Sequence, residues 1–300
     1  GDAQVAMIGQ QEAQNEDAGA RLVINTGDGK DHILFKTDET VLGRLKFENN
    51  GLLLGNLASG NLVENSVAIG RNTRVSVEDS TAVGTNASAP NNNATALGYG
   101  AESNGYASIA IGGSSNGGHS AQATTDGSIA IGGNSYTGGL NSIAIGLGAN
   151  ANAENSIAIG LNTRNLAGGT NSIAIGQNNT VSTIDGIILG NSNTISSGGI
   201  AIGKSVHTGL YGVVIGVNSD ASDGVAIGGS ATENFGAVSG YHSIAIGPGA
   251  EAADYSTAIG YNATSSAAWA TSLGYSSQTS ERYATAVGYN SVASAYYATA

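Results

Sequence analysis

The five-residue sequence Ser-Ile-Ala-Ile-Gly occurs verbatim six times in this chain, and looser copies bring the number of repeat-ending glycines to sixteen. Eight of the fifteen gaps between these anchor glycines equal the spacing from Gly132 to Gly146, which is a 14-residue period, and four more are shorter by one or two positions. A fixed short period is the signature of a solenoid, in which each repeat forms one coil of a stack. The period therefore predicts a solenoid and favours a fibre segment over an enzyme. The anchor glycines are Gly70, Gly84, Gly98, Gly112, Gly132, Gly146, Gly160, Gly176, Gly190, Gly203, Gly216, Gly228, Gly247, Gly260, Gly274 and Gly288.

Within each repeat, the residues three and one before the anchor glycine are bulky and apolar in most copies, as at Ile143 and Ile145. The residue between them is nearly always alanine, as at Ala144. This alternation is typical of a β-strand, whose neighbouring side chains point to opposite faces. We interpret the bulky pair as facing the interior of the coil and the alanine as facing outward, towards another layer or chain. A second short strand, such as residues 180–182, completes a coil of two strands and two tight turns.

The segment 1–62 does not share the period, and it predicts a β-rich fibre segment with short strands at 21–25, 32–36, 41–48 and 52–54. Residues 63–300 predict a β-roll of about sixteen coils. Longer gaps place extra residues at 113–125 and around Phe235 and Tyr241, and we expect both segments to bulge from turns without disturbing the stack. The last four residues begin another repeat, so the natural protein is expected to continue beyond Ala300.

Charge and composition argue against several classes of partner. The formal net charge is −12, and the only cations after Gly60 are Arg71, Arg74, Arg164, Lys204 and Arg282. A negative potential disfavours binding to nucleic acid and to anionic membranes. The absence of cysteine excludes disulfides and thiolate metal sites. No apolar run approaches the ~20 residues of a membrane helix, so we expect no membrane insertion by this segment.

The repeats resemble the head repeat of trimeric autotransporter adhesins of the YadA type, whose pattern is Asn-Ser-Val-Ala-Ile-Gly at a 14-residue period. The sequence Asn-Ser-Ile-Ala-Ile-Gly at residues 141–146 is representative, and the resemblance covers about residues 61–300. It implies a left-handed parallel β-roll, three chains around one axis (a homotrimer) and a role in attachment. The residues themselves predict a coil, a stack and the need for a partner, because a thin coil cannot bury its own apolar face.

The same repeat occurs in phage tail fibres, and residues 32–55 are similar to a segment common in such fibres. The pattern there is roughly Ile-x-Phe-x-Thr, then Glu-Arg-Met-Arg-Ile, then Asp-Gly-Asn-Val-Gly-Ile-Gly. This chain departs from the pattern at several positions, with Gly43-Arg44-Leu45 in place of Glu-Arg-Met among them. The sequence therefore favours a non-enzymatic, extracellular phage or phage-like tail fibre that binds a glycan or protein receptor on a bacterial or host cell surface. The alternatives are the head of a bacterial trimeric autotransporter and, more remotely, a polysaccharide-degrading fibre enzyme, which requires two converging carboxylates.

Motifs for catalysis, metals and cofactors are weak in this chain. Residues 198–205 match the phosphate-binding P-loop pattern literally, but the match contains a repeat strand and no helix is expected after it. The four histidines, His32, His119, His207 and His242, are scattered, and none has a second ligand at metal spacing. We therefore predict no catalytic residue, no metal site and no cofactor.

The aromatic residues carry the best functional signal. Nine of the sixteen Phe, Tyr and Trp residues lie after residue 240. One set, which includes Tyr297, recurs five residues before the anchor position, and another directly follows it, which predicts two aromatic columns at one end of the roll. The columns either pack between coils or across a trimer interface, or they form a platform for sugar rings. The candidate receptor-binding residues are Tyr255, Tyr261, Trp269, Tyr275, Tyr283, Tyr289, Phe235 and Tyr241.

Overall fold

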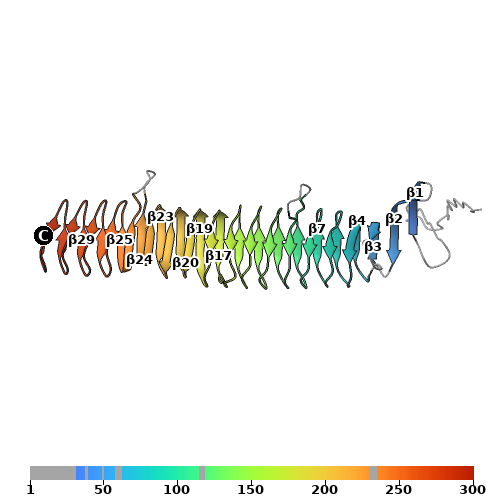
Figure 1. Ribbon diagram of the computed structural model, residues 1–300, viewed down its shortest axis with the longest axis horizontal. Helices are drawn as coiled ribbons and strands as arrows, with labels where there is room; N and C mark the ends of the chain where they lie inside the picture. Colours follow the sequence, from blue (N-terminus) through green and yellow to red (C-terminus); the bar gives the residue numbers. More distant parts are fainter. Residues whose placement is uncertain (1–31, 38–39, 49–50, 58–62, 115–118, 230–234) are drawn as a thin grey trace, which may run out of the picture.

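The computed structural model describes residues 32–37, 40–48, 51–57, 63–114, 119–229 and 235–300. The described residues form strands and turns without any helix, and their coils stack into one long rod (Figure 1). It follows that this part of the chain holds no helix with the length and hydropathy to cross a membrane. The predicted all-β solenoid of parallel, roughly 14-residue coils is confirmed.

The rod begins with three strands joined by antiparallel pairing. Strand β1 (His32–Thr37) pairs with β2 (Thr40–Glu48), and β2 pairs with β3 (Gly51–Leu57). Strand β3 then pairs in parallel with β4 (Val67–Val75), which places buried Leu53 opposite buried Ala68. The ladder of the roll therefore reaches into the segment assigned to residues 1–62, whereas the strand predicted at 21–25 lies outside the described residues.

Two parallel ladders run the length of the roll, one on each broad side of the coils, and β4, β24 and β25 contribute to both. The first ladder, which contains the residues before each anchor glycine, continues from β4 through β5 (Thr81–Val83), β7 (Thr95–Leu97), β9 (Ile109–Ile111), β11 (Ile129–Ile131), β13 (Ile143–Ile145), β15 (Ile157–Ile159), β17 (Ile173–Gln177), β19 (Gly186–Asn191), β21 (Gly199–Lys204), β23 (Val213–Val217), β24 (Asp220–Gly228), β25 (Val238–Ile246), β27 (Thr257–Ile259), β29 (Thr271–Leu273) and β31 (Thr285–Val287). The second ladder, which follows the anchor glycines, contains β6 (Ser88–Ala89), β8 (Glu102–Ser103), β10 (Gln122–Ala123), β12 (Tyr136–Thr137), β14 (Asn150–Ala151), β16 (Arg164–Asn165), β18 (Thr180–Val181), β20 (Thr194–Ser197), β22 (His207–Leu210), β26 (Glu251–Ala252), β28 (Thr264–Ser265), β30 (Gln278–Thr279) and β32 (Val292–Ala293).

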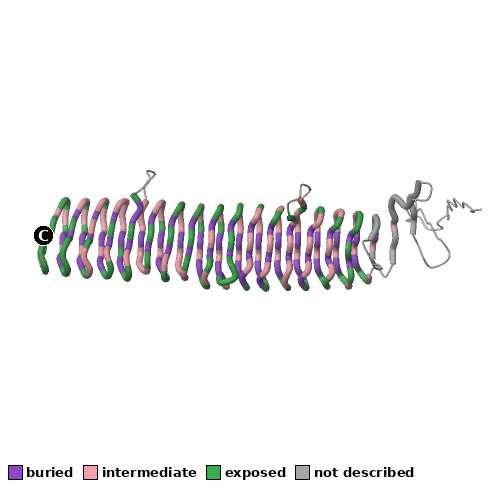
Figure 2. Tube along the Cα trace, viewed as in Figure 1, coloured by how far each residue is buried: buried purple, intermediate pink, exposed green. Residues whose placement is uncertain are grey.

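The alanine of the repeat faces the interior of the coil. Ala130, Ala144 and Ala158 are 0% exposed and lie opposite one another in the first ladder, while the isoleucines that flank them are only half-buried. Buried stretches of this kind recur in coil after coil (Figure 2). The prediction that the bulky pair faces inward was therefore wrong, because a 14-residue coil encloses room for little more than alanine and serine.

Larger interior side chains occur where a glycine makes room for them. Val181, Ile188 and Ile195 are fully buried in adjacent coils, and a Cβ atom on Gly186 would lie 2.9 Å from Cγ1 of Val181. Gly186 stands at the position that serine occupies in many other coils, as at Ser142, whose hydroxyl donates a hydrogen bond to the carbonyl of Gly139 at 2.7 Å. A larger side chain at one interior position is thus balanced by glycine at another, so the total volume inside the coil stays about the same.

The turns explain the recurrence of glycine and asparagine. Gly146 has φ of 128°, and a Cβ atom there would lie 2.5 Å from the carbonyl oxygen of Gly160 in the next coil. Asn141 and Asn162 adopt the left-handed conformation, with φ of 52° and 51°, at the two turns of the coil. Asparagine tolerates this region better than most residues.

Both insertions are shorter than predicted. Ala121 and Ala123 are fully buried, and β10 pairs with β8 and β12, so the end of the predicted loop at 113–125 belongs to the core. In the second insertion, Phe235 lies just after residues outside the described part, whereas Tyr241 lies within strand β25. The prediction missed β10 and the start of β25 because their outward-facing residues are often polar, so the sequence there resembles a loop.

Deleting residues 113–118 is expected to change the free energy of unfolding by less than about 0.5 kcal/mol. The amide of Ala121 already donates to the carbonyl of Gly112 at 3.1 Å, as the amide of Ala149 donates to that of Gly146 in an uninterrupted coil. Thermal unfolding followed by circular dichroism checks this expectation. Deleting residues 147–152 is the matched control and should unfold the rod, and equal losses in both variants would show that residues 113–118 support the stack.

Candidate binding surfaces

The outward-facing rows of the two ladders differ in chemistry. In the first ladder, the residues three and one before the anchor are mostly Ile, Val and Leu, and we name these rows the apolar wall. Several of its members, such as Ile175, Leu189 and Ile215, are more than a third exposed. In the second ladder, the residues four after the anchor, together with Gln122 beyond the first insertion, form a row of mainly polar side chains that we name the polar wall. The polar wall includes Arg74, Ser88, Glu102, Gln122, Tyr136, Asn150, Arg164, Thr180, Thr194, His207 and Asp220.

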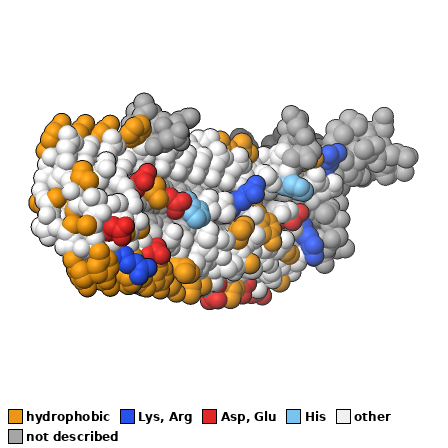
Figure 3. Space-filling model, turned by 60° about the vertical axis from the view of Figure 1, so that its left-hand side comes forward, with side chains coloured by type: hydrophobic (Ala, Val, Ile, Leu, Met, Phe, Trp, Pro, Cys, Tyr) orange, Lys and Arg blue, Asp and Glu red, His pale blue; other side chains and the backbone are white. Residues whose placement is uncertain are grey.

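The two predicted aromatic columns are confirmed as columns. Successive rings of one column stack in parallel, with centroids 5.6 Å apart for Tyr255 and Trp269 and 5.5 Å apart for Trp269 and Tyr283. In the other column, Tyr275 lies 5.2 Å from both Tyr261 and Tyr289. Hydrophobic side chains gather along two edges of the C-terminal end of the molecule (Figure 3). The column of Trp269 continues at the predicted spacing to Tyr297, which stacks on Tyr283. Phe235, which lies in the second insertion, stacks on Tyr261 at 6.3 Å.

The column that contains Trp269 occupies a strained turn position. Tyr255, Trp269 and Tyr283 have φ of 59°, 60° and 61°, at the position where earlier coils carry asparagine. Bulky residues are uncommon in this conformation, which typically costs about 1–3 kcal/mol at each site. Stacking with the neighbouring rings offsets part of this cost, and the guanidinium of Arg282 adds a cation–π contact 5.2 Å from the centre of the Trp269 ring.

Stacking determines what the columns can offer to a ligand. A ring between two parallel neighbours has part of both of its faces covered, so it presents mainly its edge and, for tyrosine, its hydroxyl group. Tyr241 meets Tyr255 edge-on at 5.6 Å and Tyr296 meets Tyr283 in the same way, which extends the cluster at its sides. The pKa of Tyr296 is raised above its ordinary value, chiefly by a hydrogen bond with the side chain of Tyr297. The geometry therefore favours packing between coils over a platform for sugar rings.

Replacing Tyr261, Tyr275 and Tyr289 together by Ser is expected to lower the free energy of unfolding by about 1.5–4.5 kcal/mol, because three stacked pairs are lost, including the one with Phe235. Thermal unfolding and binding to target cells should be measured on the same preparations. We expect lost stability with binding retained per folded molecule. Lost binding at unchanged stability would instead place a receptor site on this column.

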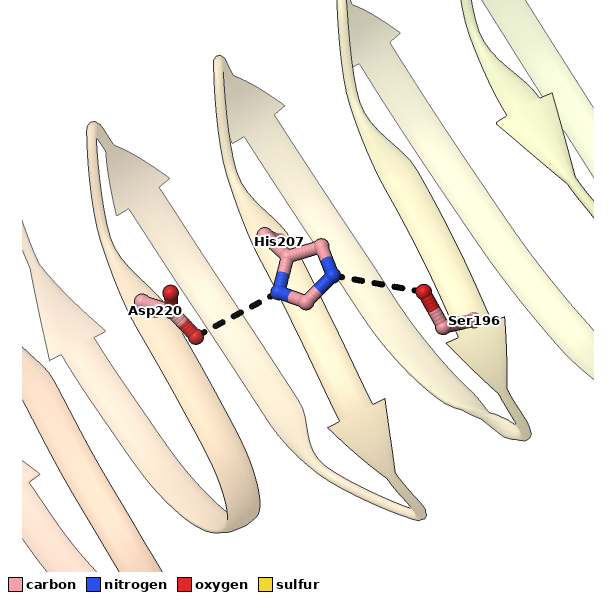
Figure 4. A network of polar contacts seen from close by, with 3 residues as sticks. All are labelled: Ser196, His207 and Asp220. Atoms are coloured by element: carbon pink, nitrogen blue, oxygen red, sulfur yellow. Dashed lines mark hydrogen bonds and ion pairs between the residues drawn. The ribbon is translucent and has the colours of Figure 1, made fainter.

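Three polar side chains from three successive coils form a short ladder on the polar wall side (Figure 4). The Ser196 hydroxyl lies 3.3 Å from Nε2 of His207, and Nδ1 of His207 lies 3.5 Å from a carboxylate oxygen of Asp220. All three residues are exposed, and the contacts are long for hydrogen bonds. Across the described residues, no group of three or more His, Asp or Glu side chains could hold a metal ion. The P-loop-like residues lie in β21, a strand of the roll, so phosphate binding by that motif finds no support in the fold.

A groove on the polar wall was missed by sequence reasoning. It has a volume of about 340 Å³ and lies across β10, β12, β14 and β16, with Tyr136, Asn150 and Arg164 on adjacent rungs. His119 belongs to the first of the four coils that line it and Leu166 to the last. The sequence offered one signal for it, which is that Arg164 is the only Lys or Arg between Arg74 and Lys204 in a strongly acidic chain. Spacing alone could not show that an aromatic ring and amide groups lie beside it.

Comparison with known families fits these coils. The family model described as YadA head domain repeat (2 copies) matches nine overlapping or adjacent segments that together cover more than half of the chain. The chain belongs to the YadA head repeat family. The matched segments are residues 64–87, 89–115, 118–135, 138–163, 167–192, 239–263, 253–277, 265–291 and 280–300.

The match to the YadA head repeat is interrupted in the middle of the rod. Residues 193–238 fall between the matched segments and contain the coils with the shortest spacing, which end at Gly203, Gly216 and Gly228. These coils keep the same ladders, because β21, β23 and β24 pair in register. No curated protein matches the chain.

Proposed function

We propose that this chain is a segment of a homotrimeric attachment fibre, displayed outside the cell or on a virion, that binds a glycan or protein receptor on a cell surface without an enzymatic step. The apolar wall is the observation that carries the proposal. Soluble monomers rarely expose contiguous apolar patches larger than a few hundred Å². A wall of Ile, Val and Leu that continues from coil to coil therefore favours burial against further copies of the chain.

The arrangement of the two walls supports closure around an axis. Because the apolar and polar walls lie on opposite broad sides of the roll, copies that bury the first keep the second in solvent. Identical chains that repeat the same contact from copy to copy form a closed ring when the rotation between neighbours adds up to a full turn. The number three is what the resemblance of the repeats to the heads of trimeric autotransporters implies.

Two settings fit such a fibre. The similarity of residues 32–55 to a segment of phage fibres favours a phage or phage-like tail fibre. The YadA head match favours the head of a bacterial trimeric autotransporter, which is our second candidate. In both settings the rod lies outside a cell and its polar wall faces potential receptors.

Sedimentation equilibrium of the full chain is expected to give three times the mass of one chain. Replacing Ile145 and Ile159 by Asp places two charges on the apolar wall and should abolish assembly, because each buried carboxylate would lack a partner. The matched control places Asp at Thr180 and Thr194, on adjacent rungs of the polar wall, and should leave the mass unchanged.

A wild-type chain that is folded and monomeric at micromolar concentration would contradict the proposed assembly. The attachment role is tested separately with the labelled wild-type protein and suspensions of bacterial and animal cells. Saturable binding to one of the two cell types is expected, and binding to neither would contradict a receptor-binding role.

A further inference from the structure

The groove on the polar wall contains an arginine side chain in an otherwise acidic molecule, and the nearest carboxylate in its row is Glu102, which lies 3.5 Å from Nε2 of Gln122 at the far end. Ten residues line it, among them Arg164, and none of the ten is Asp or Glu. Arg164 is exposed, and within the described part of the chain no carboxylate pairs with it. In a chain with a formal net charge of −12, an unpaired guanidinium in a hollow favours an anionic ligand over a cationic one. The planar guanidinium binds a carboxylate through two parallel hydrogen bonds.

The other groups that line the groove suit a sugar. Tyr136 lies two rungs from Arg164, which is a separation of about 10 Å along the ladder. Its ring rests against Gly138, where a Cβ atom would lie 3.0 Å from the ring. Aromatic rings combine an apolar surface with a hydroxyl group, and amides such as those of Gln122 and Asn150 both donate and accept hydrogen bonds. These are the groups with which proteins hold hydroxylated rings.

The amide of Asn150 adds an independent sign of an incomplete site. Its Oδ1 atom is buried and has no hydrogen-bond partner. Buried polar atoms in native proteins are rarely left unpaired, and exceptions commonly lie where a ligand or water completes the network. Asn150 stands between Tyr136 and Arg164 in the row, so its amide lies among the groups that a ligand in the groove would contact.

We propose that this groove binds a carboxylated sugar unit, with the carboxylate held by Arg164 and the sugar ring held between Tyr136 and the amides of Gln122 and Asn150. The proposal rests on the proposed attachment function and names the chemical class of receptor for it. A uronic acid in a bacterial polysaccharide and a sialic acid on an animal cell share this chemistry. Because the groove lies on the polar wall, burial of the apolar wall leaves it open to solvent.

The test uses the full chain and three soluble probes, which are methyl glucuronide, N-acetylneuraminic acid and uncharged methyl glucoside. Binding is followed by titration calorimetry and by saturation-transfer NMR at physiological salt. We expect one of the two acidic probes to bind and methyl glucoside to bind at least about tenfold more weakly, since it lacks the group that pairs with Arg164. The acidic probe that binds better identifies the source of the receptor.

Arg164→Gln should weaken binding of the better probe about tenfold or more, and Arg164→Lys should recover only part of it, because an ammonium group lacks the planar fork. Arg74→Gln is the matched control, since it removes the same charge from the same row several rungs away. Tyr136→Ser should also weaken binding, without altering the melting temperature of the rod by more than a few degrees.

Equal losses of affinity in the Arg164 and Arg74 variants would overturn the proposal, because binding would then depend only on the net charge of the chain. Equal affinity for the acidic and neutral probes, or binding of neither acidic probe, would also overturn it. Cell binding by wild-type trimers that persists in Arg164→Gln would reject this groove as the site while leaving the attachment function in place. A loss of cell binding in Arg164→Gln alone supports both.

Discussion

Ala144→Phe is expected to lower the free energy of unfolding by about 3 kcal/mol or more, which is at or above the upper end of ordinary overpacking. Ala144 is fully buried and packs with Ala149, Ala151 and Ala158 in a cluster that contains alanine alone. A phenyl ring there must push the two ladders apart, and the damage extends to the coils on both sides because their strands are paired in register. Far-UV circular dichroism during heating provides the measurement, and fluorescence of the sole tryptophan, Trp269, reports whether the C-terminal coils stay folded.

The matched control is Leu147→Phe in the same coil. Leu147 is 60% exposed and directly follows the anchor glycine, at the position where later coils carry tyrosine. It should retain the melting temperature of the wild type within a few degrees. If Ala144→Phe melted normally and only failed to assemble, the alanine row would be the one that faces another chain.

Gly146→Ala is expected to cost about 3 kcal/mol or more, although it adds only one methyl group. The backbone at Gly146 has φ of 128°, which L side chains rarely adopt, and strain of this kind is worth about 1–3 kcal/mol. The new Cβ atom would in addition meet the carbonyl oxygen of Gly160 at 2.5 Å. That oxygen belongs to the backbone of the next coil, so it moves only if the stack opens.

Gly133→Ala separates these two effects from the ordinary change in chain entropy. Gly133 lies in the preceding coil with an unstrained φ, and the nearest atom to its added Cβ would be the flexible Cδ1 of Leu147 at 3.4 Å. The melting temperature of the Gly133→Ala variant should equal or slightly exceed that of the wild type. Similar losses of stability in Gly146→Ala and Gly133→Ala would show that the turn does not require glycine at the anchor position in particular.

The period was sufficient to predict the ladders, because coils of equal length must place equivalent residues opposite one another. Ile129 therefore pairs with Ile143, and Tyr261 stacks on Tyr275, as the spacing indicated. The same argument could not tell which face of the strand points inward, since alternation has the same period for either choice. Volume decides it: a coil this short has room inside for Ala144 but not for Ile143 and Ile145.

The candidate sites depended on side-chain geometry and were harder to predict. The spacing of the aromatic residues located their columns but could not show that Tyr255 and Tyr283 stack on the two sides of the Trp269 ring. The groove combines Arg164 with residues from three earlier rungs of the second ladder, where the sequence varies from coil to coil. Nothing in the repeat itself distinguishes those rungs from their neighbours.

The direction of the ladders also governs how such a rod behaves under tension. Its strands run across the long axis, so the hydrogen bonds between coils lie along that axis and carry an axial load directly (Figure 1). One 14-residue coil occupies about 4.8 Å of the stack, yet the same stretch of chain reaches about 48 Å when pulled straight. A coil that unfolds under tension therefore spans about ten times the length that it occupied in the stack. A fibre held at both ends in flowing liquid would extend by unfolding one coil after another before its covalent chain is strained.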